Sequence, residues 1–429
     1  MTRIAALRAR EVLDSRGDPT VEVEAYTTSG PPGRAIVPSG ASTAQAEACE
    51  LRDADPQRYD GRGVRRAVAN VLGEIAPRLV GLDPFDQAAI DRLLIDLDGS
   101  PQKSRLGANA VLGASLAVAH AAAAAAHVSL FRHLGELATA AGVTAPGGAP
   151  LRPALPLPMT NMISGGLHAG GNLDFQDVLA VPVGAPDFPT ALEWLVRVYR
   201  RLGEALARDG INSRLVGDEG GYGPPLANNR EAILRVLEAI TAAGLRPTVD
   251  ITLALDIAAT HLYDGQSYHL RHGEPTATGN LNSQQMIALV LQLIQEFPLS
   301  SVEDPLAETD VDAWPILVRQ VSDKVRIVGD DLLATNPQRI RQALASKAAT
   351  AALVKPNQVG TLTETFEAIR VARAGGMTII VSARSGETED TTIADLAVAT
   401  GAEQIKIGSV TRSERLAKYN RLLRIYEEL

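Results

Sequence analysis

Three acidic residues each close a short apolar run, and together they could bind a divalent cation. Asp256 follows the letters LAL, Glu303 follows SV and Asp330 follows IVG. A charge at the end of a buried run is costly unless it meets a ligand, an opposite charge or a metal. Neighbouring carboxylates would also raise one another's pKa values, and a hard cation such as Mg²⁺ would relieve that repulsion. The sequence therefore predicts a Mg²⁺ site.

The spacing of the apolar runs indicates an α/β barrel that would bring these residues to one face. Beyond Glu303 the runs end at Asp330, Lys355, Ser382 and Lys406, about 24 to 27 residues apart. That interval suits one strand plus one helix. In such a barrel the carboxyl ends of the strands converge on one face, where active sites are built. Eight runs qualify as strands, namely 155–163, 178–183, 252–257, 301–303, 326–330, 351–355, 377–382 and 404–408.

Local signals also predict where helices begin between the later strands. Thr361 with Glu364 has the spacing of a capping box, Asn336 precedes Pro337, and Ser283 can cap a further helix. The first two barrel strands are joined by a short loop instead of a helix. We therefore expect an irregular barrel.

A separate N-terminal domain is expected before the barrel. The alternation in 20–26 predicts a half-exposed strand, and a turn leads to a second strand at 34–37. Helical patterns follow as far as residue 137. The segment rich in Ala, Gly and Pro that comes next predicts a linker. The expected division is thus a domain at 1–137, a linker at 138–154 and a barrel at 155–429.

Composition narrows the possible functions and locations. The 429 residues are 45% hydrophobic with a net charge of −9, which argues against a nucleic-acid surface. The single cysteine, Cys49, excludes an internal disulfide and fits a reducing cytoplasm. The charged start of the chain does not resemble a signal peptide. The alanine-rich run 108–130 is interpreted as a buried helix and not as a membrane span.

Taken in order, the motifs of this chain resemble those of the enolase family. The resemblance covers nearly the whole sequence, and it rests on residues 10–17, 38–43, 165–170, 216–221, 329–332, 355–361, 384–390 and 412–415. It implies an N-terminal α+β domain that caps a modified (β/α)8 TIM barrel. The implied reaction removes water from 2-phosphoglycerate to give phosphoenolpyruvate, with two Mg²⁺ ions in the active site.

The resemblance also implies how the metals and the proton transfers are divided. The tighter metal would bind the three strand-end carboxylates, namely Asp256, Glu303 and Asp330. The second metal would bind through the substrate and Ser42. Lys355 would be the base, with its pKa lowered by Mg²⁺ and Lys406, and Glu219 would protonate the leaving hydroxyl.

The remaining site residues implied by the family hold the substrate. Lys406 would bind its carboxylate, while Arg384 and Ser385 would bind its phosphorus group. His168, on a glycine-rich loop, would approach after closure. Ala41 belongs to the same loop motif as Ser42 and is expected at the substrate. The acid Asp177 completes the expected catalytic set.

Five positions depart from the family pattern. Ala383 stands where the family has His, Asp177 where it has Glu, Ala44 where it has Gly, Ser164 where it has Asn, and His261 where it has Glu. We interpret Ser164 and His261 as neutral variation. A methyl group next to the phosphorus-binding arginine opens space and removes a donor, so Ala383 and Asp177 indicate preserved chemistry on an altered substrate.

The resulting hypothesis is a paralogue similar to the carboxyphosphonoenolpyruvate synthases of phosphonate natural-product biosynthesis. Its substrate would be a small anionic carboxylate that is bulkier at phosphorus than 2-phosphoglycerate. An ordinary glycolytic enolase and a non-catalytic scaffold are the alternatives. Each charged residue taken singly could also be a surface charge or half of a salt bridge. The family implies a homodimer or a ring of dimers.

Overall fold

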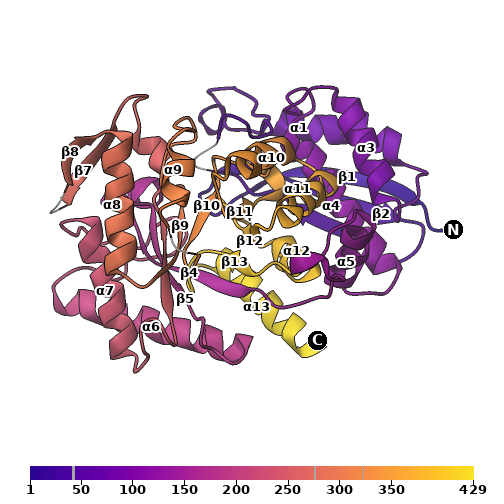
Figure 1. The fold of residues 1–429 in the computed structure, drawn as a ribbon. Coiled ribbons are helices and arrows are strands. Elements are labelled where there is room, and N and C mark those ends of the chain that lie inside the picture. Colours follow the sequence, from indigo (N-terminus) through magenta and orange to yellow (C-terminus); the bar gives the residue numbers. More distant parts are fainter. Residues whose placement is uncertain (41–43, 275–276, 322) are drawn as a thin grey trace.

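The computed structural model describes residues 1–40, 44–274, 277–321 and 323–429, and it contains a closed eight-stranded barrel with an N-terminal domain against one side (Figure 1). Ala41 and Ser42 lie outside the described residues, so their expected roles stay predictions. The α/β class and the TIM-type barrel are confirmed.

The N-terminal domain is built on a three-stranded antiparallel sheet. Its strands are β1 (Ile4–Leu13), β2 (Pro19–Thr27) and β3 (Gly33–Ile36), in that order. The hairpin of β2 and β3 was predicted, but β1 was missed. Only Ile4 and Leu7 of β1 are fully buried, and alanines and charged residues fill most other positions. The period-two pattern that identifies a strand is therefore weak.

Helices cover this sheet and reach the barrel. They are α1 (Arg65–Asn70), α2 (Ala76–Leu79), α3 (Gln87–Asp98), α4 (Ala108–Ala125) and α5 (Leu130–Ala140). Helix α4 has the length and apolar composition of a membrane span, but 83% of it is buried inside the protein. The buried helix predicted there is confirmed. Helix α5 continues three residues beyond 137, into the segment expected to be a linker.

All eight predicted barrel strands are present. They are β4 (Leu157–Ser164), β5 (Asp177–Val181), β6 (Thr252–Asp256), β9 (Leu299–Glu303), β10 (Arg326–Gly329), β11 (Ala351–Val354), β12 (Thr378–Ser382) and β13 (Gln404–Lys406). The connection between β4 and β5 holds only the 3₁₀ turn η4 (Gly166–Ala169). Strand β5 consequently runs antiparallel to both neighbours. The expected irregularity is confirmed.

Helices and one hairpin surround the barrel. The helices are α6 (Phe188–Arg208), α7 (Asn229–Ala242), α8 (Ser283–Glu296), α9 (Trp314–Val318), α10 (Pro337–Ser346), α11 (Leu362–Ala374), α12 (Thr392–Ala399) and α13 (Ser413–Glu428), and the hairpin is β7 (Tyr268–Glu274) with β8 (Ala277–Leu281). Asn336 and Thr361 cap α10 and α11 as predicted. The cap of α8 is Asn282, so the prediction of Ser283 was wrong by one residue.

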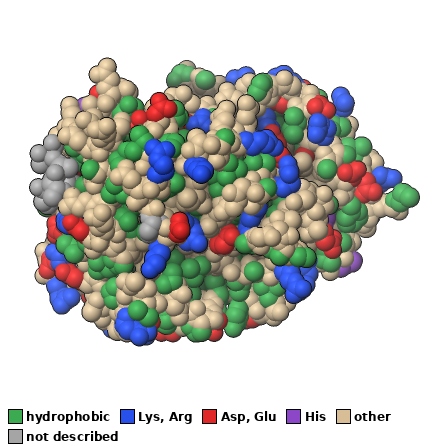
Figure 2. Space-filling view, in the orientation of Figure 1, with side chains coloured by type: hydrophobic (Ala, Val, Ile, Leu, Met, Phe, Trp, Pro, Cys, Tyr) green, Lys and Arg blue, Asp and Glu red, His purple; other side chains and the backbone are tan. Residues whose placement is uncertain are grey.

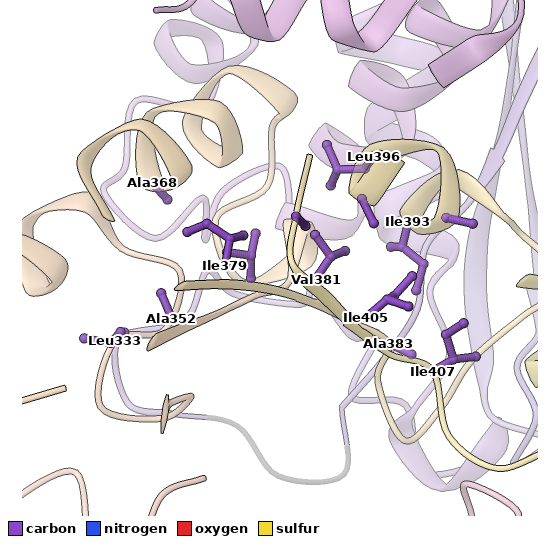
Figure 3. Packing of buried hydrophobic residues seen from close by; sticks show 14 of the residues in the cluster. Leu333, Ala352, Ala368, Ile379, Val381, Ala383, Ile393, Leu396, Ile405 and Ile407 are labelled. Atoms are coloured by element: carbon purple, nitrogen blue, oxygen red, sulfur yellow. The ribbon is translucent and has the colours of Figure 1, made fainter. Parts of the chain in front are cut away.

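Apolar packing on two sides of the strands fixes which side chains reach the barrel mouth. Ile380 of β12 points into the barrel interior, where it packs with apolar residues of five other strands. Its neighbours Ile379 and Val381 face outward into the cluster that also contains Ala368 of α11 and Leu396 of α12 (Figure 3). Strands that alternate in this way present a residue to the interior at every second position. Polar and charged residues replace the apolar ones at the mouth.

A close backbone contact joins the N-terminal domain to the barrel. The amide of Ser39 donates to the carbonyl of Gly386 at 2.8 Å, and the amide of Gly386 donates back to Ser39 at 2.9 Å. A Cβ at position 386 would lie 2.6 Å from Nη2 of Arg16 and 2.7 Å from the Ser39 carbonyl oxygen. Only glycine permits this approach.

We therefore predict that Gly386→Ala lowers the free energy of unfolding by about 1–3 kcal/mol, as overpacking does in a tightly packed region. Urea unfolding at constant Mg²⁺ would measure the change. Gly73→Ala is the matched control, because a Cβ there meets no atom within 4 Å. Equal stability of the two variants would contradict the prediction.

Candidate active site

The barrel mouth brings five of the predicted residues into one charged network. Asp256 and Glu303 are register partners on the parallel strands β6 and β9. The Lys406 ammonium donates to Asp256 Oδ2 at 2.7 Å and to the two Glu303 oxygens at 2.9 and 2.8 Å. The Lys355 ammonium donates to Asp330 Oδ2 at 2.5 Å. Side chains at the ends of five strands thus form two ion-paired sets on the same face, and each set shifts pKa values in the other.

Burial and charge shift the pKa values of this network in opposite directions. Burial raises the pKa of Glu303 well above its usual value, and the neighbouring Asp256 carboxylate raises it further. Burial lowers the pKa of Lys406, but Asp256 and Glu303 outweigh burial and the net pKa is well above the usual value. Each buried charge therefore depends on an opposite charge beside it.

The pKa of Lys355 lies above its ordinary value, whereas the sequence argument expected it to be lowered. Burial is the largest single effect and lowers this pKa, but the carboxylates of Asp330 and Glu303 together outweigh it. Lys406 does act in the expected direction and lowers it. Among the protein's own groups, the neighbouring carboxylates therefore keep Lys355 protonated.

The donors at the mouth fit a hard divalent cation. Asp256, Glu303 and Asp330 offer carboxylate oxygens only, which are the ligands that Mg²⁺ prefers. Three carboxylates with two ammonium groups carry a formal charge of −1, so a further cation is electrostatically favourable. Amides orient two of these carboxylates, because Gln176 donates to Asp256 at 3.2 Å and Gln358 donates to Asp330 at 3.0 Å.

A further acid behind the mouth was missed by the sequence argument. Asp304 accepts from the amides of Asp330 and Asp331 at 2.9 and 2.7 Å, and so fixes the start of the loop after β10. Carboxylate oxygens of these three residues lie within 4.8 Å of one another. The signal was the pair of consecutive acids at 303 and 304, of which only Glu303 was considered.

A second group of acid–base residues lies along the β4 and β5 side of the mouth. Nδ1 of His168 lies 2.8 Å from Asp177 Oδ2, and its Nε2 lies 3.9 Å from Glu219 Oε1. Asn161 donates to the other Glu219 oxygen at 3.0 Å. All three acid–base residues are buried. His168 was expected on a loop that approaches after closure, and in the structure it lies within this group.

The three groups also set one another's protonation. Burial lowers the pKa of His168, but the carboxylates of Asp177 and Glu219 outweigh burial and raise it to about 9. Burial raises the pKa of Glu219, but His168 and Arg415 outweigh it and leave the pKa below its usual value. Burial keeps the pKa of Asp177 above its usual value. The imidazole is therefore a cation between two carboxylates near neutral pH.

The predicted phosphorus-binding arginine is paired with an acid from the N-terminal domain. Nη1 of Arg384 donates to Glu47 Oε2 at 2.9 Å and to Asn357 Oδ1 at 3.1 Å, while Nη2 donates to Glu47 Oε1 at 3.3 Å. Ser385, the next residue, is also buried, and its carbonyl accepts from Arg415 at 2.6 Å. Glu47 was not predicted, because sequence gives no sign of a contact across two domains.

Two cavities adjoin these groups. One of about 330 Å³ lies between the domains and is lined in part by Pro38, Glu47, Asn357 and Arg384. The other, of about 520 Å³, lies beside the glycine-rich turn η4, and its lining includes His261. Both volumes are within the range of small-molecule sites.

The side chain of Ala383 does not border the open space that was predicted beside the phosphorus-binding arginine. Its side chain is 5% exposed and belongs to the buried hydrophobic cluster, near Ile405 and Ile407 (Figure 3). The expectation of open space at this methyl group is corrected, since apolar packing takes up the position. The described cavity that reaches Arg384 is bounded instead by Glu47 and Asn357.

Comparison with known families matches both halves of the chain. Residues 4–134 match the family model described as the enolase N-terminal domain. Residues 152–429 match the one described as the enolase C-terminal TIM barrel domain. Together they cover most of the sequence.

The His168 group predicts a pH-dependent loss of stability. The folded pKa of about 9 exceeds the usual value, so the stability that the pair provides is complete below pH ~6.5 and is lost as pH rises through about 9. The difference in unfolding free energy between the wild type and His168→Asn should fall over that range by at most about 3 kcal/mol. Urea unfolding at several pH values measures it. His127→Asn, at an exposed position, is the control. A difference in unfolding free energy between the wild type and His168→Asn that rises with pH would contradict the raised pKa of His168.

Proposed function

The chain belongs to the enolase family, and from that premise we propose that its barrel removes water from 2-phosphoglycerate or a phosphorus-substituted analogue. Family membership supports a hydratase or dehydratase. The observation that carries the finer proposal is the arrangement at the mouth. It contains a lysine paired with Asp330, one of the proposed metal ligands, and an acid, Glu219, beside the His168 imidazole.

The proposed reaction breaks a C–H bond beside the substrate carboxylate and then a C–O bond. Lys355, at the end of β11, takes the proton onto Nζ. Glu219, which must first take up a proton because its pKa lies below the usual value, gives that proton to the leaving hydroxyl, which departs as water. Lys406 binds the substrate carboxylate. Two Mg²⁺ ions would supply charge stabilisation at that carboxylate. Asp256, Glu303 and Asp330 would hold the tighter ion, and the second would bind through the substrate and Ser42.

The ion pair with Asp330 keeps Lys355 protonated, and the proposed role of base requires that this pair be weakened. Lys355 is paired with Asp330 and must give up a proton before it can accept one from carbon. Arg384 and Lys406 both lower its pKa, against the effect of Asp330. Any cation that shares the Asp330 carboxylate would weaken the pair and favour the free amine.

We propose a substrate with a larger phosphorus group, as in the carboxyphosphonoenolpyruvate synthases. One observation supports it, which is the cavity of about 330 Å³ that Arg384 lines together with Glu47 and Asn357. An ordinary glycolytic enolase is the alternative, and retention of Lys355 and Glu219 favours it equally. A scaffold without activity is disfavoured, because a buried charged network is costly to keep without a ligand.

The expected setting is a cytoplasmic homodimer or ring of dimers that binds neither membranes nor nucleic acids. The burial of α4 supports the expectation about membranes. Figure 2 shows basic and acidic side chains interspersed on the visible face, which fits the net charge of −9. A nucleic-acid surface would be a basic patch or stripe.

The substrate proposal predicts slow turnover of 2-phosphoglycerate and faster turnover of an analogue with a carboxylate on phosphorus. Enolpyruvate formation is followed by ultraviolet absorbance with Mg²⁺ present. A 2-phosphoglycerate rate equal to that of an ordinary enolase would exclude the altered substrate and leave the glycolytic alternative.

The assignment of the base predicts that Lys355→Ala lowers kcat by about 10²–10⁴-fold, the usual contribution of a general base. Chelation of Mg²⁺ should abolish turnover of the wild type. Lys324→Ala, at an exposed lysine, should keep full activity. Thermal unfolding with Mg²⁺ would show that both variants are folded, and an active Lys355→Ala enzyme would reject the assignment.

A further inference from the structure

Ser164 forms a buried contact that its interpretation as neutral variation does not explain. It is the last residue of β4 and lies opposite Asp177, the first residue of the antiparallel strand β5. Its hydroxyl donates to Asp177 Oδ1 at 2.8 Å. Ser164 is 0% and Asp177 1% exposed, so water does not compete for this hydrogen bond.

The other oxygen of the same carboxylate holds His168. Nδ1 of the imidazole lies 2.8 Å from Asp177 Oδ2, which leaves Nε2 directed toward Glu219 at 3.9 Å. A carboxylate bound at both oxygens has no freedom to rotate. The serine hydroxyl therefore controls the orientation of the imidazole through Asp177.

Ser164 also contacts the loop that carries Glu219. A Cβ built on Gly217 would lie 2.9 Å from the Ser164 Cβ, and one on Gly221 would lie 2.6 Å from its Oγ. The backbone amide of Ser164 donates to Tyr222 at 2.8 Å. The space at position 164 therefore admits a small side chain, which contacts Asp177 directly and lies against the glycines on either side of Glu219.

Two departures from the family motifs meet in this contact. Serine is shorter than the asparagine of the family pattern, and Asp177 is shorter by one methylene than its glutamate. Two shortened side chains that face each other across adjacent strands can keep a direct hydrogen bond. In this structure the two shortened side chains therefore act on each other directly.

We propose that Ser164 is a positioning residue that fixes Asp177, and through it holds the His168 imidazole against Glu219. The proposal rests on the proposed dehydration, in which Glu219 protonates the leaving hydroxyl. A cationic imidazole held at this place supplies positive charge beside the acid as the hydroxyl leaves.

A purely structural role for the hydroxyl would give different results. Ser115 provides the matched control, because its hydroxyl donates to the carboxylate of Asp91 at 2.7 Å. Both of these residues are fully buried in the N-terminal domain. Ser164→Ala and Ser115→Ala each remove a buried serine–aspartate hydrogen bond, and only the first is connected to His168. Ser115→Ala also removes the acceptor for Gln87 and for the Leu362 amide, so it is the more disruptive of the two for packing.

The first measurement is the titration of His168 by NMR of ¹⁵N-histidine-labelled full-length protein. The groups that face this imidazole are Asp177 from β5, Glu219 from its loop, Asp256 from β6 and His261 from the loop after β6. Loss of the serine donor destabilises the ionised form of Asp177, which is the form that stabilises the His168 cation. Ser164→Ala should therefore lower the His168 pKa by about one unit, while Ser115→Ala leaves it unchanged.

The second measurement is turnover of whichever of the two phosphorus substrates the wild type accepts. We expect Ser164→Ala to lower kcat about tenfold with little change in KM, because the lost hydrogen bond acts on the acid and not on substrate binding. A cycle with Asp177→Asn should be non-additive, as expected for residues in contact. The kcat of Ser164→Cys, whose thiol is a weak donor of similar size, should lie between those of the wild type and Ser164→Ala. Ser164→Cys replaces Ser164→Ala in both measurements if the alanine variant does not fold.

An unchanged His168 titration in a folded Ser164→Ala or Ser164→Cys protein would overturn the proposal, and so would additive effects in the cycle. If the wild type turns over neither substrate, the proposed function fails. The NMR titration then still decides whether Ser164 positions His168, so the two failures are distinguishable.

Discussion

Buried like charges at the ends of neighbouring strands are the constraint on which the rest of the site depends. Asp256 and Glu303 are side by side in register, and the barrel gives neither of them access to bulk water. Each must share a cation, and Lys406 contacts both. Removing one partner would leave an uncompensated buried charge, which costs several kcal/mol. The arrangement is stable only as a complete set of opposite charges.

Much of the barrel could be predicted because its strands are short apolar runs at regular intervals. The caps Asn336 and Thr361 followed from local chemistry in the same way. Strand β1 could not be recognised, because few of its residues are buried. Sequence patterns report burial, and a strand that is mostly exposed gives a weak pattern.

The charged partners were harder to predict than the charged residues themselves. Glu47 and Arg384 are 337 positions apart, and only the docking of two domains brings them together. Asp304 was not predicted, because the strand-end pattern identified only Glu303, the residue that faces the mouth, and not the acid that follows it. Ser164 is the clearest case, because its partner Asp177 is set by the register of an antiparallel pair.

The bridge between Ser39 and Gly386 has an evolutionary consequence. The turn that carries Arg384 is held by a segment of the N-terminal domain, and the acid that pairs with this arginine comes from the same domain. A barrel expressed alone would carry the chemistry of proton transfer but an incomplete anion site. Recombination that exchanged N-terminal domains between relatives would therefore change the surroundings of Arg384, while the proposed base Lys355 and the proposed acid Glu219 stayed with the barrel.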